Sequence, residues 1–117
     1  MVDLAPAADN VGMSALIVFC TCPDEAVADR IALCLIEERL AACVTRTSGV
    51  VSTYRWQGAV QRETEVRLAI KTTRDRFNAL RDRILVLHPY ELAEIVAVDI
   101  ALCSAPYLAW IESETRI

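Results

Sequence analysis

The stretch SALIVFCTCPDEAVADRIALCLIEERLAA (residues 14–42) decides the fold, because it places a strand directly before a long amphipathic helix. Residues 14–22 are a continuous apolar run of strand length with branched and aromatic side chains. Residues 23–42 follow with apolar positions at the spacing of a helix that buries one face. Those positions are Val27, Ile31 and Leu35. Pro23 suits the first position of a helix, so the helix is predicted to begin there.

A β-hairpin is predicted next. Residues 43–56 are rich in strand-forming side chains, with Gly49 at the place of a bulge, and the chain turns at Gly58. Residues 61–73 then alternate between apolar and polar side chains, as a half-buried strand does. The apolar face holds Val66, Leu68 and Ile70, and the polar face holds Glu65, Arg67 and Lys71. The two runs are therefore expected to pair as the arms of one hairpin.

A second amphipathic helix is predicted over residues 73–87, where apolar side chains step by three and four residues. These are Phe77, Leu80, Ile84 and Leu87. Thr72 or Thr73 is placed to cap the start of this helix. Pro89 disfavours the α conformation at the residue before it. The helix is therefore expected to end at His88, the only histidine of the chain.

The remaining elements complete a recognisable order. Residues 93–103 have the pattern of another strand, and residues 105–114 that of a short terminal helix with Pro106 near its start. The order β-α-β-β-α-β followed by a helix predicts an α+β protein with the ferredoxin-like sandwich, in which two helices cover one face of an antiparallel sheet. One domain is expected over residues 14–117, and residues 1–13 are interpreted as a flexible extension before it.

The first and last strands of this sheet are apolar on both faces. A sheet that is covered by helices on one side should alternate apolar and polar residues, but residues 14–22 and 93–103 do not alternate. The chain is also 55% hydrophobic, above the usual share of roughly 45–50%. The second face therefore needs cover from outside the domain, and further copies of the same chain are the expected cover.

Charge and motifs exclude several classes of protein. The formal net charge is −4, and arginine supplies eleven of the twelve basic residues without forming a basic run. Nucleic acid and membrane are therefore not expected as partners, and no apolar stretch approaches the roughly 18–20 residues of a membrane span. An enzyme is not expected either, because the sequence has no Ser/His/Asp set, no glycine-rich phosphate loop and no paired carboxylates at a suggestive spacing.

The cysteines indicate a reduced, cytoplasmic protein. There are five, an odd number, and four of them lie in apolar runs. A secreted disulfide framework is normally even and loop-rich. Because free cysteine is among the most buried residue types, each of the five is first interpreted as a small buried hydrophobic residue.

Five blocks of the sequence resemble the CutA divalent-cation tolerance family: CTCPDEAVADRIALCLIEERLAACV, YRWQG, IKTTRDRF, LHPYELAEI and YLAWI. They occur in the order and spacing of that family over residues 14–113. The resemblance implies a compact homotrimer whose sheets pair edge to edge around a threefold axis. It also implies a protein that binds divalent copper and takes part in the response to metal ions.

The resemblance also implies a metal site. Family members with a described copper site use the cysteine of a C-T-x-P-D-E block and the histidine before P-Y, and the matching residues here are Cys20 and His88. Some members carry a second histidine just before the first, where this chain has Leu87. A weak or transient copper(II) site is therefore expected, completed by water or by a neighbouring subunit. Cys22 would share a face with Cys20 if the strand continued that far.

Other interpretations of these residues remain open. His88 also suits the end of a helix, where such a side chain interacts with the helix dipole by typically ~0.3–1 kcal/mol, and Cys20 also suits a strand core. The chain could instead be a trimeric signalling or adaptor module that binds a small molecule or a protein in clefts between subunits. Four residues are candidates for that cleft: Trp56, Lys71, Tyr90 and Glu91.

Overall fold

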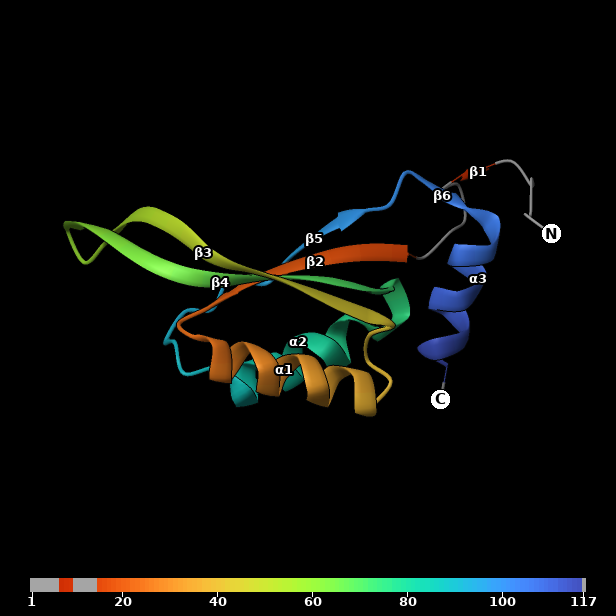
Figure 1. The fold of residues 1–117 in the computed structure, drawn as a ribbon, viewed down its shortest axis with the longest axis horizontal. Helices are drawn as coiled ribbons and strands as arrows, with labels where there is room; N and C mark the ends of the chain where they lie inside the picture. Colours follow the sequence, from red (N-terminus) through yellow and green to blue (C-terminus); the bar gives the residue numbers. More distant parts are fainter. Residues whose placement is uncertain (1–6, 10–14, 117) are drawn as a thin grey trace.

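The computed structural model describes residues 7–9 and 15–116 (Figure 1). The strands are β1 (Ala7–Asp9), β2 (Ala15–Cys22), β3 (Cys43–Trp56), β4 (Ala59–Thr73), β5 (Val96–Asp99) and β6 (Leu102–Ser104). The helices are α1 (Glu25–Glu37), α2 (Phe77–Leu87) and α3 (Ala105–Glu114), and a 3₁₀ turn, η1 (Arg74–Arg76), precedes α2.

The main sheet has four strands in the order β3-β4-β2-β5, and each neighbouring pair is antiparallel. Figure 1 shows α1 and α2 side by side on one face of this sheet, while α3 lies near its end beside β6. The central strand β2 pairs with β4 along one edge and with β5 along the other. The predicted α+β sandwich with a C-terminal helix is therefore confirmed.

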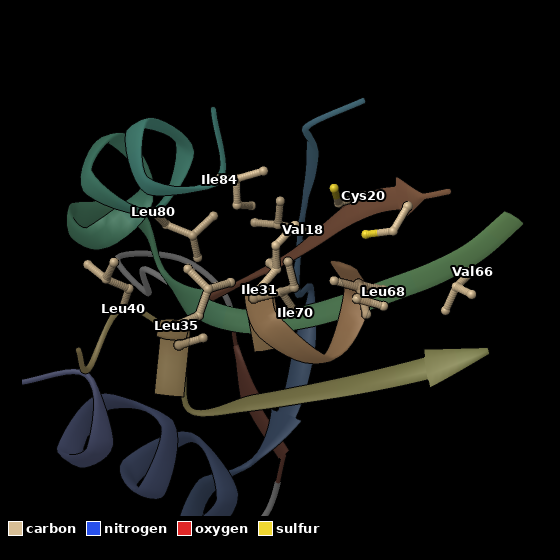
Figure 2. Packing of buried hydrophobic residues seen from close by; sticks show 13 residues of the cluster. Val18, Cys20, Ile31, Leu35, Leu40, Val66, Leu68, Ile70, Leu80 and Ile84 are labelled. Atoms are coloured by element: carbon tan, nitrogen blue, oxygen red, sulfur yellow. The ribbon is translucent and has the colours of Figure 1, made fainter. Parts of the chain in front are cut away.

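The core fills the space between the sheet and the two helices (Figure 2). Alternate side chains of β2 and β4 point into it, because successive residues of a strand face opposite sides. The β4 side chains in the core are Val66, Leu68 and Ile70, as predicted. The apolar side chains predicted for the two helices pack against them from α1 and α2. The fully buried members include Val18, Leu68 and Ile70 from the sheet and Ile31, Leu35, Leu80 and Ile84 from the helices.

The starts of both helices differ from the predictions. Asp24 caps α1, since its Oδ1 accepts a hydrogen bond from the Val27 N–H at 2.9 Å; Pro23 therefore lies before the cap and not inside the helix. Thr73 makes no side-chain capping bond. Thr72 is buried on the helix-facing side of β4, where its hydroxyl donates to the Leu40 carbonyl at 2.7 Å. That carbonyl competes successfully for the hydroxyl that was expected to cap the helix.

The end of α2 follows the prediction. His88 has extended backbone angles, φ −85° and ψ 133°, and its N–H closes the last helical hydrogen bond to the Ile84 carbonyl at 2.8 Å. The following proline keeps His88 out of the α region. The direction of the His88 side chain is therefore set by an extended backbone and not by a helical one.

The strand predicted over residues 93–103 is two strands in two sheets. β5 pairs with β2 only as far as Asp99, which lies opposite Leu16 near the start of β2. Farther along the chain, β6 pairs instead with β1. Residues 7–9 of the expected N-terminal extension thus belong to a strand, while its residues 1–6 and 10–13 lie outside the described part of the chain.

The sheet face away from α1 and α2 is covered by α3 at one end only and is open beside β5 within the single chain. Ile17 pairs with Val98 and Phe19 with Val96, and these four side chains lie on the face away from α1 and α2. Val96 and Val98 remain 50% and 45% exposed. This confirms that α1 and α2 cover only one of the two apolar faces.

The long hairpin β3–β4 is shaped by two glycines. Gly49 has φ +73°, and the β3–β4 register shifts between Thr47 and Val50, so the predicted bulge is confirmed. Gln57 and Gly58 both have positive φ, 50° and 82°, as the tight two-residue turn of a hairpin requires. Figure 1 shows the turn end of this hairpin projecting beyond the helices.

The bulge gives a stability prediction. Replacing Gly49 by Ala should lower the free energy of unfolding by about 1–2 kcal/mol, because an L-residue with a Cβ is strained in the left-handed region. An added Cβ would meet no atom within 4 Å, so the loss comes from the backbone and not from a clash. Gly49→Asn is the matched control and should lose less, because asparagine tolerates this region. Chemical denaturation measures both; an alanine variant as stable as wild type would contradict the prediction.

Candidate functional site

A buried group of three metal-ligand side chains lies where β2 ends and the chain leaves α2. Cys20, Cys22 and His88 each offer one ligand atom, and these atoms all lie within 4.8 Å of one another. No other group of three or more histidine, cysteine or acidic ligands with this geometry occurs among the described residues. Figure 2 shows Cys20 at the margin of the apolar core. We call Cys20, Cys22 and His88 the Cys–Cys–His group.

The strand geometry brings the two cysteines together. β2 continues through Cys22, which pairs with Val66 of β4, so Cys20 and Cys22 share the helix-facing side of the strand. Both side chains are fully buried. The sequence predicted that the two cysteines share a face only if the strand reached Cys22. In the structure the strand does reach Cys22, because α1 begins after Pro23.

His88 is held by hydrogen bonds at both ring nitrogens. Nε2 lies 2.7 Å from the Thr21 carbonyl oxygen, and Nδ1 accepts from the Tyr90 N–H at 3.1 Å. A carbonyl only accepts and a backbone N–H only donates, so this arrangement places the ring proton on Nε2. The side chain is 7% exposed and links the end of β2 to the segment after α2. The helix-end interpretation suggested that this side chain interacts with the end of its own helix. Instead, the ring bonds to Thr21 and to the Tyr90 main chain.

The two thiols differ in how readily they lose a proton. The neighbouring Cys20 side chain lowers the pKa of Cys22, against the opposing effect of burial. The pKa of Cys20 is raised, first by its interaction with the Cys22 side chain and then by burial. Cys22 is therefore the thiol that ionises first. A thiolate rather than a thiol is the metal ligand, so the pair is ready to supply one.

A pocket of about 480 Å³ lies close to the group, between the β3–β4 hairpin and the segment after α2. Thr21 is one of its lining residues, and its carbonyl oxygen is the one bonded by His88. Three of the four residues predicted for a cleft, Trp56, Tyr90 and Glu91, line this pocket. Lys71 lies elsewhere, with its Nζ 3.3 Å from the hydroxyl of Tyr107 on α3.

Glu65 is a pocket residue that the sequence reasoning missed. Its place on the polar face of β4 was predicted, but the side chain is only 5% exposed. The Tyr90 hydroxyl donates to its Oε2 at 2.7 Å. Alternation along a strand predicts which face a residue lies on, but not which residues pack over it. Here Tyr90, which is distant in sequence, packs over Glu65. No signal in the sequence marked this pair.

The fold and the Cys–Cys–His group together define a class: a small ferredoxin-like domain with a candidate metal centre of sulfur and nitrogen ligands. Within that class, the chain belongs to the CutA1 divalent ion tolerance protein family, whose family model matches residues 16–114.

Individual relatives agree with this assignment. The divalent-cation tolerance protein CutA of Thermus thermophilus is 48% identical over 99 residues, covering 85% of this chain and 96% of the relative. The crystal structure of CutA from Xylella fastidiosa has a TM-score of 0.86 at 45% identity, and the match covers 88% of this chain and 99% of that one. The periplasmic divalent cation tolerance protein CutA of Archaeoglobus fulgidus has a TM-score of 0.85 at 30% identity, covering 87% and 99%.

The Tyr90–Glu65 pair predicts an unusual tyrosine titration. Burial, and then the hydrogen bond to Glu65, raise the pKa of Tyr90 above its ordinary value near 10. Its contribution to stability is therefore complete below pH about 10 and is lost as the pH rises towards the folded-state pKa. The pKa of Tyr54 is raised as well, so alkaline titration followed by phenolate absorbance should show late tyrosine ionisation, and Tyr90→Phe should remove its last step.

Glu65→Gln is the control for the cause. It keeps a side chain of similar size but removes the negative acceptor, so Tyr90 should titrate earlier than in wild type. A last ionisation step that is unchanged in Tyr90→Phe would show that another residue is responsible.

Proposed function

We propose that this protein binds divalent copper at the Cys–Cys–His group and takes part in the response to metal ions. The observation that carries the proposal is the convergence of three buried ligand atoms within 4.8 Å. The Thermus thermophilus relative is named a divalent-cation tolerance protein, which supports a role with divalent cations. Cys20 and His88 are the ligands that the family resemblance implies, and Cys22 adds a third.

The ligand set fits a single copper ion. Two ligands on one ion lie at most about 4.6 Å apart when each metal–ligand distance is about 2.3 Å, so small side-chain shifts are enough to bring all three into contact with it. Imidazole suits divalent copper and thiolate suits monovalent copper. Leu87, at the place of a second histidine, packs against the core and is no ligand. Water or a group from a neighbouring subunit would complete the shell.

Cys22 would favour metal binding at this site, whereas the hydrogen bonds of His88 would limit the affinity for the metal. Of the two thiols, Cys22 gives up its proton more readily, because the neighbouring Cys20 side chain lowers its pKa. His88, by contrast, must release either the Thr21 carbonyl or the Tyr90 N–H before a ring nitrogen can reach an ion. This competition is the physical reason for a weak or transient copper(II) site. When bound, the ion would be held and stored here, and no catalytic step is assigned to it.

We infer further that the working form is a homotrimer in the cytosol. The half-exposed Val96 and Val98 on the open face of the sheet support self-association, because an apolar face of this kind favours burial against another chain. All five cysteines are free, which suits a reducing compartment. In the described part of the chain, none of the helices has the length and apolar character that crossing a membrane requires.

Copper titration tests the site. Under anaerobic conditions, in competition with a chelator of known affinity, His88→Ala and Cys22→Ser should each weaken copper binding by at least about tenfold, the scale expected when a metal site is disturbed. Cys34→Ser is the matched control, because Cys34 is a free cysteine outside the group, and it should bind as wild type does. Circular dichroism checks that each variant is folded. Equal affinities for wild type and His88→Ala would overturn the site.

Light scattering tests the assembly. The wild-type particle should have about three times the mass of one chain, as a closed threefold assembly requires. Val98→Asp places a charge on the open face and should shift the particle to lower mass. Val86→Asp is the control, because Val86 is 74% exposed on α2, on the opposite side of the sheet, and should leave the mass unchanged. A wild-type particle of single-chain mass would contradict the trimer.

A further inference from the structure

The Cys–Cys–His group lies inside the apolar core and not at the protein surface. Cys20 and Cys22 have no exposed surface, and His88 keeps only 7% of its own. Both cysteines belong to the buried hydrophobic cluster between the sheet and the two helices (Figure 2). Because the cysteines face α1 and α2, their burial does not depend on what covers the open face of the sheet. An ion held here would be shielded from solvent.

Shielding from water disfavours divalent copper more than monovalent copper. Divalent copper prefers square-planar or tetragonal surroundings of nitrogen and oxygen ligands, and the group supplies a single nitrogen-bearing side chain, His88. Water is the ordinary source of missing oxygen ligands, but an apolar interior holds little of it. Monovalent copper has no need of a square of ligands and is satisfied by fewer of them. The burial of the group therefore favours the monovalent ion.

The ligand atoms are also mainly soft. Two of the three are sulfur, and soft thiolate ligands select monovalent copper, whereas imidazole suits the divalent ion. The neighbouring residues do not change this balance. Leu87 packs against the core and offers no second nitrogen, and Thr21 directs its hydroxyl to the opposite face of β2.

The sulfur of Cys20 is weakly engaged in the structure. Its acceptor is the Thr21 carbonyl oxygen at 3.9 Å, which is a long contact even for a thiol. The Cys22 sulfur lies within 4.8 Å of it, on the same face of the strand. Little therefore has to be broken before the two sulfurs meet one ion.

His88 is the ligand that must be rearranged. Its Nε2–H donates to the Thr21 carbonyl at 2.7 Å, and a metal-binding histidine usually donates its second ring N–H to a carbonyl or carboxylate in this way. The nitrogen left for an ion is Nδ1, which accepts from the Tyr90 N–H at 3.1 Å. Binding through Nδ1 loses that hydrogen bond, so the nitrogen is harder to engage than the sulfurs. An ion that sulfur alone can hold is favoured.

We propose that the Cys–Cys–His group holds copper in the monovalent state in preference to the divalent state, with the sulfurs of Cys20 and Cys22 as the main ligands and Nδ1 of His88 as the third. The inference rests on the proposed function, because copper must bind at this group. It deepens that function by assigning the oxidation state that the group selects. Divalent copper then binds more weakly at the same residues.

Two competition titrations on the full-length protein test the selection. Under anaerobic conditions, copper(I) is added in competition with bicinchoninate, and copper(II) in competition with a chelator of known affinity for the divalent ion. The dissociation constant for copper(I) should be at least about tenfold lower than that for copper(II), the scale on which a metal site responds to its surroundings. Equal affinities for the two oxidation states, or tighter binding of copper(II), would overturn the inference.

Silver(I) and zinc(II) separate softness from charge. Silver(I) is soft and monovalent and keeps its oxidation state in the presence of thiols, so it should bind and displace copper(I). Zinc(II) also accepts thiolate ligands, but it prefers a complete tetrahedral shell that the three side chains of the group do not supply. An excess of zinc(II) should therefore leave copper(I) in place. Failure of silver(I) to bind, or release of copper(I) by zinc(II), would contradict a preference for the soft monovalent ion.

Single substitutions separate the roles of sulfur and nitrogen. Cys22→Ser should weaken copper(I) binding by at least about tenfold, and Cys22→Ala is a second variant that avoids a buried hydroxyl. His88→Ala should weaken copper(I) binding less than the Cys22 variants do, although it loses copper(II). Cys34→Ser is the control, because Cys34 is a free cysteine outside the group, and it should bind both ions as wild type does. If His88→Ala loses copper(I) as fully as the folded Cys22 variants, the sulfurs are not the main ligands and the assignment fails.

The inference and the proposed function fail separately. A wild-type protein that binds neither oxidation state of copper would overturn the metal site itself. A protein that binds copper(II) at this group at least as tightly as copper(I) would keep the proposed metal site and overturn only the selection of the monovalent state.

Discussion

The pairing of β2 between β4 and β5 is the constraint on which the rest of the structure depends. One side of this strand supplies Val18 and Cys20 to the core, and the other contributes Ile17 and Phe19 to the open face. Because an antiparallel register fixes which side each residue faces, a slip of one residue would exchange the two sets. The core, the open face and the Cys–Cys–His group all derive from this one register.

Local patterns predicted the elements well where neighbours in sequence also decide the contacts. The β3 and α3 boundaries, the Gly49 bulge and the end of α2 at Pro89 all depend on residues close to one another along the chain. The predictions were wrong where a distant partner intervened. The Leu40 carbonyl takes the hydroxyl of Thr72, and the last strand divides because its two halves meet different partners.

The candidate site was likewise predictable only where neighbours in sequence decide the arrangement. Cys20 and His88 came from a family resemblance, and Cys22 followed from the two-residue period of a strand once β2 was known to reach it. The tautomer of His88, which two backbone groups hold in place, had no counterpart in the sequence. The burial of Glu65 by Tyr90 was equally hidden, because main-chain donors and tertiary cover leave no mark on a residue pattern.

Tyr90 touches both sides of this region: its main-chain N–H is bonded to His88 and its phenol to Glu65, and its ring centroid lies 4.7 Å from that of the imidazole. A displacement of Tyr90 on the pocket side therefore changes the hydrogen bonding that holds His88 on the other side, and any coupling of this kind is reciprocal. The Cys–Cys–His group and the pocket share one side chain and are not independent parts of the fold.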